Sequence, residues 1–60
     1  MNRLEKRKNI AARLQPVAGE DAFLEAGFFM DFCDKNPAAD ESRLIERRLN
    51  GEPIQYVLGE

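Results

Sequence analysis

Residues 47–60, RRLNGEPIQYVLGE, combine the end of one helix, a tight break and the start of a second short helix. Asn50-Gly51 stops the first helix, because glycine takes a positive φ at no steric cost. Pro53 suits the first position of the next helix, where its missing N–H costs nothing. Apolar residues recur at helical spacing on both sides of the break: Leu44, Ile45 and Leu49 before it, and Ile54, Val57 and Leu58 after it. This stretch predicts a helix-break-helix unit in an all-α protein.

Working back to the N-terminus, residues 3–14 form the first predicted helix. Asn2 can cap it, and Glu5 stands at the third helical position, a spacing like that of a capping box. Pro16 disfavours helix in the residue before it, so we expect the helix to stop there and residues 16–19 to connect it to the next. Its expected core contacts are Ile10, Ala11 and Leu14, with Leu4 weaker.

The second predicted helix spans residues 20–34 and holds every phenylalanine of the chain: Phe23, Phe28, Phe29 and Phe32. Its apolar arc is too wide for one stripe, so we expect this helix to be central and packed on two sides. Gly27 in its middle predicts the close approach of another helix. An alternative is that part of the phenylalanine arc docks a partner. Cys33 is interpreted as a small buried hydrophobic residue.

Residues 34–37 break the chain again. The third helix can begin after Asn36, with Pro37 as its first residue, or at Asp40, and it ends at Leu49 in either case. The fourth helix, residues 53–58, is too short to be stable without packing. We therefore predict one helical domain, residues 1–60, built as a small bundle of about four helices.

Composition narrows the function. The chain has no histidine and only one cysteine, which rules out an internal disulfide and disfavours a zinc site, and we expect no metal and no cofactor. Acidic residues are interpreted as lying at helix starts or on polar faces. No glycine-rich phosphate loop and no catalytic constellation is recognisable, so we expect a non-enzymatic chain. No apolar run approaches a membrane span and no signal peptide is evident, so we expect a cytoplasmic protein with no membrane partner.

The net charge of -2 is spread unevenly. Residues 1–14 carry five basic groups and one acidic group, whereas residues 15–60 carry four basic and ten acidic groups. A basic arm could touch nucleic acid, but it has no interleaved aromatic residues for stacking, so a solvated first helix is favoured. A helix-turn-helix interpretation of the last two helices is also disfavoured, because residues 53–58 contain no Arg or Lys to reach DNA.

The run RRLNGEPIQYVLGE in residues 47–60 closely resembles the end of the N-terminal helical domain of the HemK/PrmC family of release factor glutamine-N5 methyltransferases. A weaker resemblance covers residues 21–33, DAFLEAGFFMDFC, which look like a helix of the same domain. Family members usually have an additional helical segment between these two stretches, and this chain departs from that pattern.

The resemblance implies a module that helps such a methyltransferase engage its peptide-chain release factor, whose Gly-Gly-Gln glutamine is methylated. In the family, S-adenosylmethionine and an Asn-Pro-Pro-Tyr motif belong to a later catalytic domain, which we expect to be absent from residues 1–60 and to act in cis. Asn36-Pro37 is followed by Ala38-Ala39 and does not match that motif.

The predicted protein-contact residues are Arg43, Arg47 and Arg48, because an arginine side chain can bind a carboxylate through two hydrogen bonds and is common at interfaces. The alternative for these arginines is pairing with neighbouring acidic residues on a solvated face. The alternative for the whole chain is a stand-alone helical interaction protein, including a homodimer that shares the phenylalanine surface.

Overall fold

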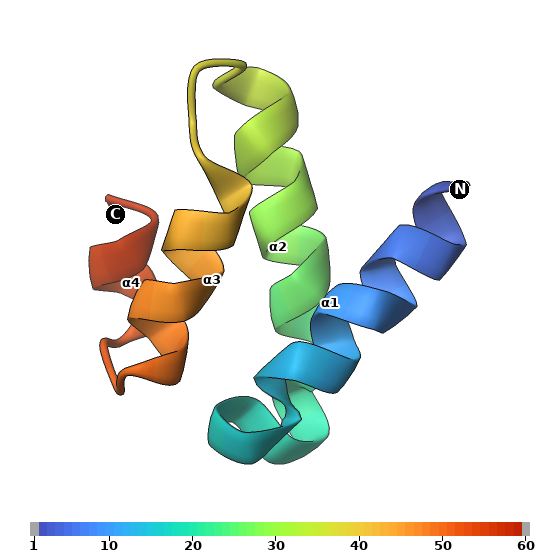
Figure 1. Ribbon diagram of the computed structural model, residues 1–60, viewed down its shortest axis with the longest axis vertical. Coiled ribbons are helices and arrows are strands. Elements are labelled where there is room, and N and C mark those ends of the chain that lie inside the picture. The colour runs from blue at the N-terminus through green and yellow to red at the C-terminus, as the bar shows by residue number, and fades with distance from the viewer. Residues whose placement is uncertain (1, 60) are drawn as a thin grey trace.

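The computed structural model describes residues 2–59, and this part of the chain contains helices and no strand. The all-α prediction is confirmed. Figure 1 shows the order of the elements: α1 (Arg3–Ala18), a 3-10 turn η1 (Gly19–Asp21), α2 (Ala22–Lys35), α3 (Glu41–Leu49) and α4 (Ile54–Val57).

Helix α1 starts as predicted and ends later. The Asn2 Oδ1 atom accepts a hydrogen bond of 2.8 Å from the Glu5 amide, which confirms the cap. The predicted end at residue 14 is wrong, because the helix continues through Pro16 to Ala18. Proline removes one helical hydrogen bond, but Val17 and Ala18 pack against the core and hold the last turn in place.

The turn between α1 and α2 is therefore η1 and not the predicted connection over residues 16–19. Gly19 adopts φ 54°, and its amide donates to the Gln15 carbonyl to close α1. Residues 20 and 21 belong to this turn, so α2 begins at Ala22, two residues later than predicted.

Helix α2 is central, as predicted. It packs mainly against α1 and less extensively against α3, and α1 and α3 also contact each other directly. In the view of Figure 1, α1 crosses α2 at an angle and α3 lies on the other side of α2. The largest fully buried side chains come from three different helices: Phe29 of α2, Leu14 of α1 and Ile45 of α3. Burying each such side chain contributes about 1.5–3 kcal/mol, so these three residues fasten the helices to one another.

Of the two possible starts of the third helix, the structure has the one at Asp40. The Asp40 Oδ1 atom accepts a hydrogen bond of 3.2 Å from the Arg43 amide, so α3 is capped by Asp40. It ends at Leu49, as predicted. Pro53 is the residue before α4 and not its first helical residue, and Val57, only 3% exposed, holds this short helix on the core.

Candidate functional site

Arg48, one of the three predicted contact arginines, lies in an intramolecular ion pair. Its Nε donates to Glu25 Oε1 at 2.8 Å and its Nη2 approaches Glu25 Oε2 at 3.3 Å. Its Nη groups also approach the carbonyl oxygens of Val17 and Glu52, at 3.5 and 3.4 Å. The Arg48 side chain is only 15% exposed, so its guanidinium links α3 to α2 and to the end of α1.

Glu25 lies in the first turn of α2, in line with the interpretation of acidic residues at helix starts, but its burial and its pairing with Arg48 were not predicted. Its residue exposure is 8%, and it lies one helical turn before the buried Phe29. A buried carboxylate needs a partner, which Arg48 supplies from 23 positions along the chain. No local pattern reveals a pair so distant in sequence.

The other two arginines stay on the surface. Arg47 forms an ion pair with Glu52, with an Nη2–Oε1 distance of 2.8 Å and both side chains 40% exposed. The hydrogen bond from Arg47 lowers the pKa of the Glu52 carboxyl below its ordinary value. Arg43 is exposed, and no carboxylate in residues 2–59 forms an ion pair with it. The three arginines therefore do not form one exposed cluster.

An exposed apolar surface lies instead on the side of α2 that faces away from the core. Leu24 is 51% exposed and Phe28 45%, and Leu4 of α1, 54% exposed, lies beside them. Two hollows flank Phe28. Large side chains left in solvent around hollows are typical of binding surfaces.

The first hollow, which we call the α4 groove, lies between α2 and α4. Its volume is about 410 Å³, and its apolar walls are Phe28 and Phe32 of α2 and Ile54 and Leu58 at α4. Asp31, Lys35 and Gln55 complete its rim.

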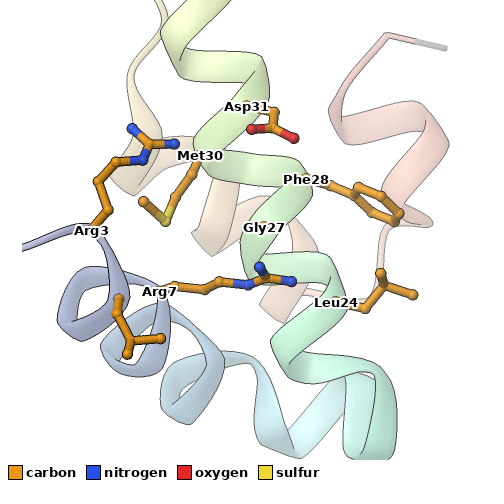
Figure 2. A pocket seen from close by; sticks show the side chains of 8 residues that line it. Arg3, Arg7, Leu24, Gly27, Phe28, Met30 and Asp31 are labelled. Carbon is orange, nitrogen blue, oxygen red and sulfur yellow. The ribbon is translucent and has the colours of Figure 1, made fainter.

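The second hollow, which we call the Arg7 groove, lies between α1 and α2 and measures about 250 Å³. Figure 2 shows Arg3 and Arg7 reaching from α1 towards α2, with the Arg7 guanidinium beside Gly27. The remaining lining residues are Leu4, Leu24, Phe28, Met30 and Asp31.

Gly27 explains how Arg7 reaches this position. A Cβ atom at residue 27 would lie 2.7 Å from the Arg7 Cζ and Nη2 atoms, which is closer than real contacts allow. The predicted close approach of another helix at Gly27 holds only in part, because the atoms closest to Gly27 are those of the Arg7 guanidinium and not the backbone of α1. The sequence reasoning missed Arg7 itself, although the glycine was the signal that something lies there.

Cys33 is half-buried, so its interpretation as a buried hydrophobic residue holds only in part. Desolvation, followed by the negative charge of Glu41, raises the pKa of its thiol. A raised pKa keeps the thiol protonated, which disfavours nucleophilic chemistry.

Tyr56 is 73% exposed and lies outside the core. Within residues 2–59 no group of three or more His, Cys, Asp or Glu side chains is arranged to hold a metal ion. None of the helices in this range is long and apolar enough to cross a membrane.

Comparisons with protein-family models, with curated proteins and with solved structures find no significant match to this chain.

Proposed function

We propose that this chain is a protein-binding module that helps a release factor glutamine methyltransferase to engage its peptide-chain release factor. In this proposal it is a small bundle of about four helices that performs no chemistry itself. The catalytic methyltransferase domain, which supplies S-adenosylmethionine binding, belongs to the same working enzyme.

One observation carries the proposal. The family-like stretch, residues 47–60, contributes Ile54 and Leu58 to the wall of the α4 groove. The opposite wall is formed by Phe28 and Phe32 of the second family-like helix. The two parts of the sequence that resemble the family thus build one apolar hollow on the surface, and a hollow flanked by aromatic side chains is typical of a protein-docking site.

The arginines contribute unequally under this proposal. Arg43 is exposed and has no ion pair within residues 2–59, so it is available to a partner. Arg47 is also at the surface, but a partner carboxylate would compete there with Glu52. Arg48 supports the module from inside, because its charge is already paired with Glu25.

The direct test is isothermal titration calorimetry of the 60-residue protein with the purified release factor from the same organism. We expect binding tighter than about 100 μM, and we expect Phe28→Ala to weaken it at least about tenfold, since a half-exposed aromatic residue between two hollows is a typical hot spot. Tyr56→Ala is the matched control, because Tyr56 is an exposed aromatic residue that lines neither hollow.

An affinity weaker than about 100 μM for the release factor would contradict the proposal. Equal losses from the Phe28 and Tyr56 substitutions would place the contact elsewhere on the module.

The second candidate is a stand-alone interaction protein that self-associates through the same apolar surface. The exposure of Leu4, Leu24 and Phe28 favours it, because a second copy would remove all three from water. Sedimentation equilibrium decides this point: a monomer at millimolar concentration removes the homodimer, and a dimer broken by Phe28→Ala supports it.

A further inference from the structure

We propose that the Arg7 groove receives an amphipathic helix of the protein partner and that Arg7 pairs with a carboxylate at the edge of that helix. The proposal rests on the chain being a protein-binding module. It adds the chemistry of the partner segment, namely an apolar stripe flanked by an Asp or Glu side chain.

The position of the Arg7 guanidinium is fixed before any partner arrives. Its Nε donates a hydrogen bond of 2.9 Å to the Phe23 carbonyl oxygen, and its Cζ atom lies 4.0 Å from the centre of the Phe23 ring. Gly27 gives it space on the other side. A side chain held in this way loses less conformational entropy on binding than a free surface arginine does.

The charge of Arg7 is nevertheless unmatched. Among residues 2–59 no carboxylate forms an ion pair with Arg7, although the arginine is half-buried. The neighbouring Arg3 differs, since its Nη2 lies 2.9 Å from an oxygen of Asp34. Arg7 uses only its Nε in a hydrogen bond to the protein. Its two Nη groups therefore remain to donate hydrogen bonds to a carboxylate.

The size and lining of the groove suit an inserted side chain. Its volume of about 250 Å³ is smaller than that of most small-molecule pockets, which hold about 300–1,000 Å³. Leu4, Leu24 and Phe28 provide the apolar contacts around it. One or two apolar side chains from a helix fit this space, with the carboxylate one turn away on the same face.

A second copy of this chain fits the groove less well. In a two-fold dimer the same patch meets itself, so Arg7 would meet a surface that carries Arg3, Arg7 and a single Asp31. Arg3 is already paired with Asp34, but each Arg7 would still face the Arg7 of the other copy. A foreign acidic segment brings a carboxylate without a second arginine, so it is favoured over a second copy.

The test uses two synthetic helical peptides of about 15 residues, labelled with a fluorophore, with leucines at i, i+3, i+4 and i+7. They differ only in one residue at the edge of the stripe, Glu in one and Gln in the other. Fluorescence anisotropy with the 60-residue protein should show the Glu peptide binding about tenfold more tightly at low salt, with the difference shrinking as salt is added. Amide shifts of Leu24, Gly27 and Phe28 in NMR spectra should follow the same titration.

Three variants assign the difference to Arg7. Arg7→Gln should make the two peptides bind equally, and Arg13→Gln, the same charge change at an exposed position of α1, should leave the preference intact. Gly27→Ala should also remove the preference, because the new Cβ displaces the guanidinium. Alanine is the better helix former, so this third variant keeps the fold while moving Arg7.

Equal binding of the two peptides to the unchanged protein would overturn the proposal, as would an unchanged preference in Gly27→Ala. The release factor titration separates this outcome from failure of the proposed function. If the release factor binds and Arg7→Gln has no effect on its affinity, the groove proposal alone fails. If the peptides are discriminated and the release factor does not bind, the groove remains and the partner is another protein.

Discussion

Each face of α2 combines a phenylalanine of α2 with an arginine from a neighbouring helix, and the two faces differ in how far these side chains are buried and paired. On the inner face, Phe29 is fully buried and Arg48 reaches across to a carboxylate on the helix. On the outer face, the adjacent Phe28 is 45% exposed and Arg7 reaches across to a glycine and a backbone carbonyl. On the inner face, Phe29 is out of contact with water and the charge of Arg48 is matched by Glu25. On the outer face, Phe28 stays half-exposed and Arg7 has no ion-pair partner in residues 2–59.

The largest effect should come from truncating Phe29, the buried member of the two neighbouring phenylalanines. Phe29→Ala should destabilise the fold by about 3–5 kcal/mol, because it leaves a cavity among α1, α2 and α3. A domain of this size has roughly 3–9 kcal/mol of total stability, so much of the variant should be unfolded. Urea unfolding followed by circular dichroism measures the loss. Phe28→Ala is the matched change and should cost less than about 1.5 kcal/mol; equal costs would mean that the faces do not differ.

Breaking the inner ion pair should have the next largest effect. Arg48→Met leaves the Glu25 carboxylate buried without a partner, and we expect a loss of about 2–4 kcal/mol in urea unfolding. Replacing both partners, Glu25→Leu with Arg48→Met, should recover most of that loss, since no charge is then buried. Arg43→Met is the surface control, and a loss there as large as in Arg48→Met would argue against a special role for the pair.

The smallest effect concerns Cys33 on the inner side of α2. Its raised pKa leaves less thiolate than a free cysteine has, so iodoacetamide should alkylate it several-fold more slowly at pH 8 in the folded protein than in urea. The folded state also holds the thiol proton more tightly. This contribution to stability is present below the ordinary thiol pKa and is lost as pH rises towards the folded value. Faster alkylation of the native protein would contradict this description of the site.

Local sequence patterns predicted the helices, and the two confirmed helix caps show why such patterns are sufficient for this purpose. Asn2 and Asp40 lie at helix starts, where a side-chain oxygen satisfies an otherwise unpaired amide, and this requires no knowledge of the rest of the fold. The end of α1 was predicted wrongly because the prediction used only the local effect of Pro16, which disfavours a helical conformation in the residue before it. Packing of the last turn against the core outweighs it.

The candidate site was harder to predict for the same reason. Gly27 indicated a close approach, but no spacing in the sequence identifies Arg7 as the group that approaches, 20 positions earlier. Arg48 looks like any surface arginine of an amphipathic helix until Glu25 is found beneath it. Which charged residues are paired inside the fold depends on how the helices cross, and this is determined by tertiary packing.

The contact between Arg48 and Glu25 has a kinetic consequence. Helices α1 and α2 are neighbours along the chain and make most of the inter-helix contacts, so this hairpin can form quickly from local interactions. The ion pair joins positions 23 residues apart and can form only when α3 settles onto the hairpin. Its formation therefore reports the docking of α3 and α4, and native-state hydrogen exchange should show these two helices opening at a lower free energy than α2 does.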